Sequence, residues 1–458
     1  MKVVRDSKFR HVFGEPDKKT YEDLRLSSKA TESTGIRGNS KFFSFPWDSG
    51  GGGALAVVPL PRTGRLPRDL PLVTGHSGPI LDFEFNPFDD NMLCSCSEDL
   101  TVKVWNIPDE GIKAHLKEPL VNLEGHGKKV SFCTHNPSVN GIVATTSFDL
   151  TCKIWNIAEQ EEAFSLPVAD QVLSLKWNYT GSLLAATCKD KKLRIIDPRQ
   201  RSIAAECKIH EGAKASKVEW LGSTNLLDEC NKLVTTGFSS QAERQLNVWD
   251  MRNFSSTEDA KELNQLILDQ GTGALYPFWD PGCQMLYLAG KGDGNVRFFE
   301  ATPEEPYLHY ISDYRSTTPQ KGFAFFPKRC VDVSRHEIMK GLKLETTSVI
   351  PISFRVPRKS EAFQEDLFPD CTAGVAAMQA EEWVSSEESR PPIQQSMRPG
   401  AASAAAAQGA GSGAATGVVS VKDLKKNLAE AQVRIQALEK ENELLKAELA
   451  QLKGASAA

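Results

Sequence analysis

The stretch GHSGPILDFEFNPFDDNMLCSCSEDLTVKVWN, from Gly75 to Asn106, decides the fold of this chain. Apolar and polar residues alternate along it in short runs, and clusters of Asn, Pro, Asp and Gly separate the runs. Alternation with period two, broken by such clusters, predicts successive short antiparallel strands joined by tight turns. The stretch begins with a Gly-His pair and closes on Trp-Asn, and these landmarks mark one structural unit.

The same plan recurs along the chain. A second stretch, from Gly125 to Asn156, also runs from Gly-His to Trp-Asn, with the same spacing between its His and its Trp. Five segments end in a strand that closes on a large apolar residue and then a polar one: TVKVWN, TCKIWN, KLRIID, QLNVWD and NVRFFE. Repeats of this length with Gly-His and Trp-Asp landmarks indicate one β-propeller blade each.

Two less regular repeats flank these five. The strands KFFSFPW and ALAVVPL lie upstream, and GFAFF, EIMKGLKL and VIPISFRV lie downstream, between Gly322 and Val356. We expect the N-terminal segment SKFRHVF to add a strand to the last repeat, because pairing the chain ends closes the ring and removes exposed sheet edges. The sequence therefore predicts an all-β fold, a seven-bladed WD-repeat β-propeller over residues 1–356.

Polar residues recur inside the predicted blades at equivalent positions. We expect a His, a Ser (Ser97 or Ser147), an Asp and the closing Trp to form a hydrogen-bonded chain within a blade. The grouping looks catalytic, but its repetition favours internal bracing. The residues given this structural role are His76, Asp99, Trp105, His126, Asp149, Trp155 and Trp249.

Composition and motifs narrow the classes of function. The net charge of −5 gives no reason to expect nucleic acid as a partner. The N-terminus lacks the apolar core of a signal peptide, no stretch is long enough to span a membrane, and ten cysteines without CxxC pairs indicate reduced thiols in a cytosolic protein. Gly290–Gly294 lacks phosphate-loop spacing, and His210 and His336 lack the second His of a metalloprotease. We expect no enzyme, cofactor or metal site.

The composition changes after Val356. Residues 357–384 mix charged residues with isolated large apolar ones, such as Phe363, Leu367 and Trp383, and cannot build a core alone. We therefore expect them to form an extension packed on the propeller. Residues 385–420, rich in Ser, Glu, Pro, Gly and Ala, are expected to form a flexible linker.

Apolar residues return in a heptad pattern over residues 421–453, with Lys and Glu outside the stripe, which predicts a coiled-coil oligomerisation domain. A lone surface helix would need a broader apolar face. The segment from Arg434 to Glu439 resembles a trimerisation motif, in which these two residues pair between chains. Asn442 at an a position is frequent in parallel dimers. A trimer is favoured and a dimer is the alternative. The residues expected to set assembly are Arg434, Ile435, Leu438, Glu439, Asn442 and Leu445.

Several blocks outside the repeats resemble the coronins, a family of actin-filament-binding WD-repeat proteins. These blocks are VVRDSKFRHVFG, YEDLR, the glycine run before ALAVVPL, TTGFSSQAERQLNVWD, YLAGKGDGNVRFFE and VPRKSEAFQEDLFPD. The resemblance implies a C-terminal extension on one face of the propeller and binding to filamentous actin (F-actin). It also implies a coiled coil that supports oligomerisation and engagement of the actin-nucleating Arp complex.

The resemblance also implies which residues bind actin. Arg25 matches the basic residue of the family's Tyr-Glu-Asp-x-Arg element, and an arginine suits the acidic surface of actin. Lys8 and Arg10 in the expected closing strand, with Lys2 and Arg5 nearby, are weaker candidates. Lys2 stands where some relatives carry a phosphorylatable serine.

These expectations combine into an actin regulator of the cytoplasm and cell cortex. Each propeller would contribute one modest contact, and the coiled coil would link propellers so that they bind a repeating filament together. The alternative is a WD-repeat scaffold that recruits phosphopeptides, ubiquitin-system proteins or membrane lipids.

Overall fold

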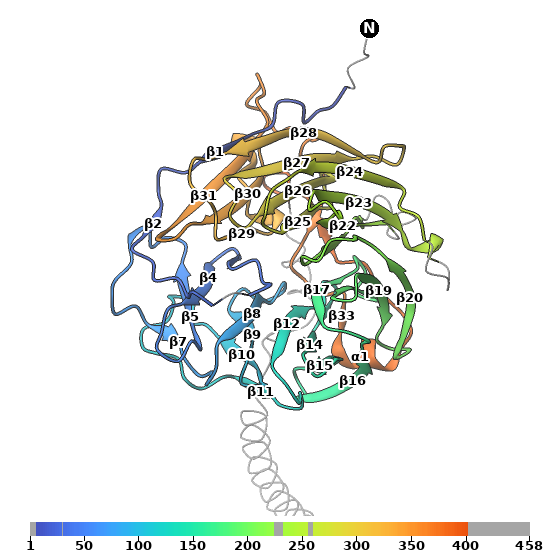
Figure 1. The fold of residues 1–458 in the computed structure, drawn as a ribbon. Coiled ribbons are helices and arrows are strands. Elements are labelled where there is room, and N and C mark those ends of the chain that lie inside the picture. Colours follow the sequence, from blue (N-terminus) through green and yellow to red (C-terminus); the bar gives the residue numbers. More distant parts are fainter. Residues whose placement is uncertain (1–5, 30, 224–231, 255–259, 402–458) are drawn as a thin grey trace, which may run out of the picture. The chain divides into compact units, whose positions relative to one another are not determined.

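The computed structural model describes residues 6–29, 31–223, 232–254 and 260–401. Within these ranges the chain forms a ring of seven mainly antiparallel sheets, which follow one another around the ring in chain order (Figure 1). We call them blades 1 to 7. The seven-bladed β-propeller expected from the repeats is thus confirmed. Lys2, Arg5 and the predicted coiled coil lie outside the described residues.

Each of the first six blades is a meander of four strands that follow one another from the inner to the outer edge. Blade 1 contains β3 (Arg37–Gly38), β4 (Phe42–Trp47), β5 (Ala54–Pro59) and β7 (Leu72–Val73); blade 2 contains β8 (Ile80–Phe85), β9 (Met92–Ser97), β10 (Val102–Asn106) and β11 (Val121–Leu123); blade 3 contains β12 (Val130–His135), β14 (Ile142–Ser147), β15 (Thr151–Asn156) and β16 (Glu161–Pro167). Blade 4 contains β17 (Val172–Trp177), β18 (Leu184–Cys188), β19 (Lys192–Asp197) and β20 (Ser202–Lys208); blade 5 contains β21 (Lys217–Trp220), β22 (Lys232–Phe238), β23 (Arg244–Asp250) and β24 (Asn264–Asp269); blade 6 contains β25 (Leu275–Asp280), β26 (Met285–Gly290), β27 (Asn295–Ala301) and β28 (Leu308–Arg315).

Burial follows the position of a strand within its blade. All six residues of β9 are buried, because neighbouring blades cover both faces of the middle strands. The outermost strand β24 alternates between partly buried and exposed residues, since one of its faces meets solvent. Period-two alternation therefore weakens from the outer strands to the middle of a blade.

Blade 7 is closed by both ends of the propeller sequence. It contains β29 (Gly322–Phe325), β30 (Glu337–Leu344) and β31 (Ser348–Arg355), to which β1 (Phe13–Pro16), β2 (Tyr21–Glu22) and β6 (Gly64–Arg65) are added. β1 runs antiparallel to β31, with Phe13 opposite Arg355 and Pro16 opposite Ile352. The N-terminus therefore closes the ring, as expected.

The closing strand begins later than the sequence suggested. Residues 8–11 form turns in which Arg10 N–H donates to the Ser7 carbonyl and Val12 N–H to the Phe9 carbonyl, at 3.3 and 3.0 Å. Phe9 and Val12 are both buried in the core of blades 6 and 7. Buried residues three positions apart fit a turn and not a strand. Lys8 and Arg10 thus precede the closing strand, which corrects their expected placement within it.

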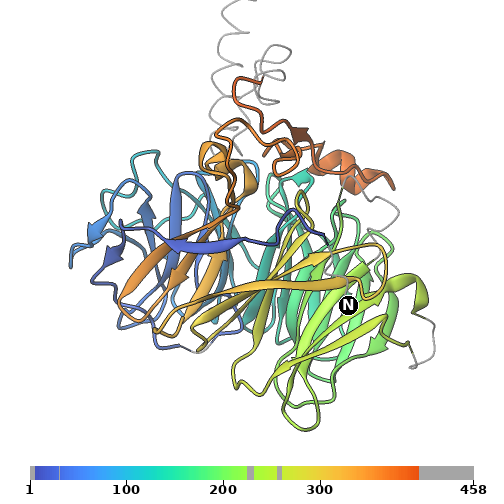
Figure 2. The same ribbon diagram turned by 90° about the horizontal axis from the view of Figure 1, so that it is seen from above.

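The propeller has two distinct faces. In a four-stranded meander the turn between the second and third strands lies at one end, and the other two connections lie at the opposite end. We call the first the turn face and the second the extension face. Residues 357–401 gather on the extension face, where β33 (Met378–Gln379) pairs in parallel with β13 (Val139–Asn140), in the connection between β12 and β14 (Figure 2).

The packed extension is longer than expected. After the short helix α1 (Ala380–Ser385), residues assigned to the linker still contact the propeller. The Arg199 guanidinium donates to the Glu388 carbonyl at 2.7 Å, and the Gln394 amide donates to the Tyr179 hydroxyl at 2.9 Å. β34 (Gln394–Gln395) pairs with β32 (Cys371–Thr372). These residues belong to the extension because their backbone groups form hydrogen bonds with the propeller or with β32. Composition alone does not reveal such bonds.

The remaining elements are short. Three 3₁₀ helices span Met251–Asn253, Lys328–Cys330 and Val333–Arg335. The nine described cysteines are free thiols, and eight of them are buried. Within the described ranges, no helix is long and apolar enough to span a membrane.

Candidate functional site

A hydrogen-bonded chain braces blade 2 near the turn face. The indole N–H of Trp105 donates to the Ser95 hydroxyl at 2.8 Å, and this hydroxyl lies 2.8 Å from Nε2 of His76. Nδ1 of His76 lies 2.8 Å from the Asp99 carboxylate. Every group is satisfied when the hydroxyl donates to Nε2 and Nδ1–H donates to Asp99. The chain thus fixes the orientation of the His76 ring through both of its nitrogens.

The hydroxyl in this chain comes from a different position than the sequence suggested. In blade 2 it belongs to Ser95, and in blade 3 Thr145 takes the same place between His126 and Trp155. Ser97 instead donates to the Gly78 carbonyl at 2.9 Å, and Ser147 donates to the Lys128 carbonyl at 2.9 Å. The expected serines thus tie down loops. Side chains two positions apart share one face of a strand, so the pattern could not separate them.

Blade 5 contains a third version of the brace. Trp249 donates to the Thr235 hydroxyl at 2.8 Å, which lies 2.9 Å from Nε2 of His210. Gln245 takes the place of the aspartate, with Oε1 3.1 Å from Nδ1 of His210. A His whose partner changes from carboxylate to amide without loss of the network is performing a structural task.

The electrostatics of the brace agree with that role. Burial by itself raises the pKa of Asp99, but the hydrogen bond and charge of His76 and the hydrogen bonds from Thr101 together outweigh it and hold the pKa below its usual value. Burial lowers the pKa of His126 despite the hydrogen bond to Asp149, so its imidazole stays neutral. The brace therefore keeps the carboxylate of Asp99 ionised as a hydrogen-bond acceptor for His76, which is a structural role.

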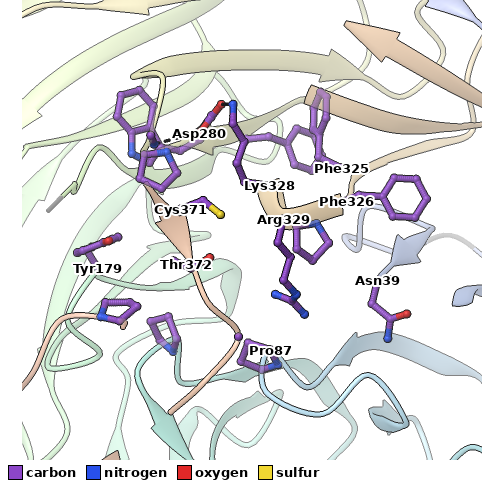
Figure 3. A pocket seen from close by; sticks show the side chains of 18 of the residues that line it. Asn39, Pro87, Tyr179, Asp280, Phe325, Phe326, Lys328, Arg329, Cys371 and Thr372 are labelled. Atoms are coloured by element: carbon purple, nitrogen blue, oxygen red, sulfur yellow. Dashed lines mark hydrogen bonds and ion pairs between the residues drawn. The ribbon is translucent and has the colours of Figure 1, made fainter. Parts of the chain in front are cut away.

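A cavity lies where the central channel meets the extension. It has a volume of about 450 Å³, and residues from all seven blades and from the extension line it (Figure 3). Phe325 and Phe326 of blade 7 and Tyr179 of blade 4 give it an aromatic wall, and Cys371 and Thr372 belong to the extension that crosses it. This volume is within the range of small-molecule sites.

The polar groups of the cavity are already paired with one another. The buried ammonium of Lys328 lies 2.5 Å from the Asp280 carboxylate. The Arg329 guanidinium lies 3.2 Å from Asp90, and Lys176 lies 3.1 Å from Glu219. The indoles of three tryptophans donate to carbonyls of the preceding blades: Trp177 to Thr134, Trp220 to Lys176 and Trp279 to Gly222. These contacts join blades and leave no converging set of free polar groups among the described residues that line the cavity.

The segment around Arg25 crosses the turn face from blade 7 to blade 1. Leu24 is buried, and its N–H donates to the Thr347 carbonyl of blade 7 at 3.1 Å. The Arg25 carbonyl accepts from Asp48 N–H at 2.8 Å, in the turn between β4 and β5. Further along, the Glu32 carboxylate lies 2.5 Å from the buried ammonium of Lys217. The backbone of the segment is therefore anchored on both sides of Arg25.

The side chain of Arg25 differs from its anchored backbone. It is exposed, and no hydrogen bond or ion pair links its guanidinium to any other residue in the described parts of the chain. The nearby Arg65 lies 3.6 Å from Asp23, so a different arginine neutralises that carboxylate. Arg25 thus presents a free cation from a fixed backbone.

Charged side chains extend from this segment over blades 2 and 3. The Lys29 ammonium lies 3.1 Å from the Glu98 carboxylate in the turn between β9 and β10. Lys129 of blade 3 lies 3.6 Å from the same carboxylate and 4.2 Å from the centre of the Phe148 ring. Sequence reasoning missed this connection, because its members are far apart in the chain.

Lys8 and Arg10 lie away from Arg25. The Lys8 ammonium donates to the Asp366 carbonyl of the extension at 2.5 Å. The turn that carries both residues precedes β1 at the Arg355 end of β31, whereas Arg25 follows β2 at the Ser348 end. Eight residues of strand separate these ends, about 25 Å. The structure therefore does not join the three cations in one patch.

Four family models match segments of the chain. A domain of unknown function, DUF1899, matches residues 2–65, and the WD domain, G-beta repeat, matches residues 69–106 and 117–156. A type of WD40 repeat matches residues 349–391, and the WD40 domain of anaphase-promoting complex subunit 4 matches residues 150–223. Arg25 lies in the first of these regions, before the WD repeats.

Two curated relatives match most of the chain. Coronin-A of Dictyostelium discoideum is 43% identical over 393 residues, which cover 85% of this chain and 85% of that protein. The chain belongs to the coronin family. A coronin-like protein of Saccharomyces cerevisiae is 39% identical over 409 residues, 87% of this chain and 61% of the yeast protein. The coronin match therefore covers less than two thirds of the yeast relative.

Solved structures agree with the coronin fold. The crystal structure of the WD40 domain from Toxoplasma gondii coronin is 38% identical with a TM-score of 0.79, covering 85% of this chain and 98% of that chain. A chain of the mitotic checkpoint complex, 13% identical with a TM-score of 0.55 over 78% of this chain and 98% of that one, shares only the propeller fold.

Proposed function

We propose that this coronin binds actin filaments through the turn face around Arg25 and thereby regulates the actin cytoskeleton at the cell cortex. The single observation that carries the proposal is the free guanidinium of Arg25 on an anchored backbone. A fixed backbone lowers the conformational entropy lost on binding, and a free guanidinium can donate to carboxylates in two parallel bonds. Filamentous actin offers an acidic surface for such contacts.

Lys2, Arg5, Lys8 and Arg10 enter the proposal as weaker contributors. Lys8 and Arg10 lie toward the extension face, so they would contact a different part of a filament, or a different filament, from Arg25. Lys8 already donates to a carbonyl of the extension, which reduces its availability. Arg25 is therefore the residue on which the proposal rests.

The C-terminal heptads supply the second half of the proposal. Residues 421–453 would join chains into an oligomer, with a trimer favoured by the Arg434–Glu439 motif. Several propellers on one oligomer would bind neighbouring subunits of a filament together, so the combined affinity would exceed that of one propeller by orders of magnitude. The same helix would cross-link filaments or engage the Arp complex.

Co-sedimentation of the full-length chain with actin filaments tests the proposal. The wild-type chain is expected to pellet with filaments, and Arg25→Glu is expected to lose at least about tenfold in affinity, because it places a carboxylate against an acidic surface. Arg62→Glu is the matched control. Arg62 is also exposed, and it follows Pro59 at the extension-face end of β5.

Each outcome has a distinct meaning. Equal pelleting of the wild-type, Arg25→Glu and Arg62→Glu chains would show that Arg25 is not the contact. Failure of the wild-type chain to pellet would contradict filament binding itself. Recruitment of other proteins or lipids by the propeller would then be the remaining interpretation of the fold.

A further inference from the structure

Two leucines stand out on the turn face because they are exposed. Leu100 and Leu150 keep 41% and 39% of their surface open to solvent. The other exposed large apolar side chains in the described ranges lie in outermost strands of their sheets: Phe13 in β1, Ile203 in β20, Ile267 in β24 and Tyr310 in β28. Only the two leucines lie in turns among these residues, at the same position of blades 2 and 3.

Their backbone conformation makes leucine an unfavourable choice. Leu100 has φ of 70° and Leu150 has φ of 65°, in the left-handed region, where a side chain collides with its own backbone. The turn itself requires this conformation, since Lys191 in blade 4 and Ala242 in blade 5 also have positive φ there. Asn and Gly adopt it more readily than leucine. Leu100 and Leu150 therefore both combine an unfavourable backbone conformation with an exposed apolar side chain. Neither feature stabilises the propeller.

The two leucines continue the surface that carries Arg25. Leu100 follows Glu98 in its turn, and Glu98 pairs with Lys29 of the Arg25 segment at 3.1 Å. Leu150 follows Phe148 in its turn, and Phe148 lies under the Lys129 ammonium, which also approaches Glu98 at 3.6 Å. A connected row of contacts thus runs from the Arg25 segment to blade 3, and a leucine follows Glu98 and Phe148 by two positions in the two turns.

We propose that Leu100 and Leu150 form an apolar docking patch for the actin filament, next to the cationic contact of Arg25. The inference rests on the proposed function and assigns the apolar part of the same interface. An interface of charge alone gives steering and specificity, whereas burial of apolar side chains supplies most of the affinity. Lys29 and Lys129 share the single carboxylate of Glu98, so the row keeps a net positive charge that matches an acidic partner surface. Continuity with Arg25 places both contacts on one partner.

The test replaces each leucine with a residue that suits the turn. Leu100→Asn, Leu150→Asn and the double variant remove apolar surface while introducing a side chain that tolerates positive φ. The expected result is an unchanged or raised melting temperature with filament affinity at least about tenfold weaker for the double variant. Ala242→Asn is the matched control, because it places the same new residue in the equivalent turn of blade 5 and removes no large apolar side chain.

Ionic strength distinguishes the two parts of the interface. The loss of filament affinity caused by Arg25→Glu is expected to become smaller as the salt concentration is raised, because salt screens charge. The loss of affinity in the double leucine variant is expected to persist, because it comes from apolar burial. Wild-type binding with an unaffected double variant would overturn the apolar patch and leave the role of Arg25 intact. A double variant that changes only the oligomeric state in sedimentation velocity would assign the patch to chain–chain contact and overturn the proposal. Absence of wild-type binding would overturn the proposed function and the patch together.

Discussion

The Ser95 hydroxyl lies 2.8 Å from the indole nitrogen of Trp105, and both residues are completely buried. The same hydroxyl contacts His76, so it links the third strand of blade 2 to the loop that opens the repeat. Because water cannot replace a lost partner at this depth, the bond contributes chiefly through the penalty for breaking it. The Ser95 hydroxyl therefore satisfies two groups of the brace, the indole N–H of Trp105 and Nε2 of His76.

Ser95→Ala is expected to lower the free energy of unfolding by about 2–4 kcal/mol, because it leaves the indole N–H of Trp105 and Nε2 of His76 each without a partner. Ser97→Ala removes the hydrogen bond to the Gly78 carbonyl and the one accepted from Asp99 N–H. Because both bonds are only partly buried, the expected cost is about 1 kcal/mol. Urea unfolding followed by tryptophan fluorescence measures both values. An equal or larger loss in Ser97→Ala would contradict the assignment of Ser95 to the brace.

Acid should destabilise the protein in two steps. Burial lowers the pKa of His126 below 6.5, so the unfolded chain takes up that proton first and stability begins to fall below about pH 6.5. Burial alone would raise the pKa of Asp149, but hydrogen bonds from Thr151 and His126 outweigh it and lower the pKa from 3.8 to about 2. The stability contributed by Asp149 is complete above about pH 5 and is lost as the pH falls toward about 2.

The matching variant for the second step is Asp149→Asn. Its unfolding midpoint in urea is expected to be lower than that of the wild-type chain at about pH 7, and to fall less steeply between about pH 5 and about pH 2.5. Asp69→Asn, at an exposed position, serves as the control for removing a charge. If the urea midpoint of Asp149→Asn fell with pH as steeply as that of the wild-type chain, Asp149 would not be the source of this pH dependence.

Trp383 is expected to hold the extension on the propeller. It is completely buried, lies edge-on to Trp177 with ring centres 5.9 Å apart, and lies 5.2 Å from the Arg199 guanidinium. Trp383→Ala should cost about 3–5 kcal/mol locally. Limited proteolysis should then cleave within residues 357–401 while the propeller stays folded. Glu381→Ala, on the exposed side of α1, should resist cleavage as the wild-type chain does; equal resistance in Trp383→Ala would disprove the anchoring role.

The heptad pattern of residues 421–453 predicts the oligomeric state of the full-length chain in solution. Sedimentation equilibrium of the full-length chain is expected to give three times the 50.3 kDa chain mass, and deletion of residues 421–453 should give monomers. Glu439→Ala, which removes one partner of the trimer motif, should shift the equilibrium toward smaller species. A wild-type mass of two chains would indicate a dimer. It would favour Asn442 as the residue that sets assembly and contradict the trimer expected from the Arg434–Glu439 motif.

Several features of the fold were predictable because their causes are local. The repeated landmarks from His76 to Trp105 predicted the blades, since each blade is a meander of strands that are neighbours in sequence. Closure by the N-terminus was also predictable, because an open ring would leave strand edges unpaired. The start of β1 at Phe13 was not, because burial of Phe9 and Val12 between blades 6 and 7 overrides the local strand pattern.

The sequence by itself determined the repeat, the number of blades and the family, and it singled out Arg25 through a motif outside the repeats. Tertiary structure alone decided that Ser95 braces the blade, that the extension continues past residue 384 to include β34, and that Arg25 and Lys8 lie at opposite ends of β31. It also linked the turn that carries Leu100 to the Arg25 segment through the ion pair of Lys29 with Glu98. The physical reason is that periodicity reports which residues share a face of one strand, whereas a ring of packed blades determines which faces meet.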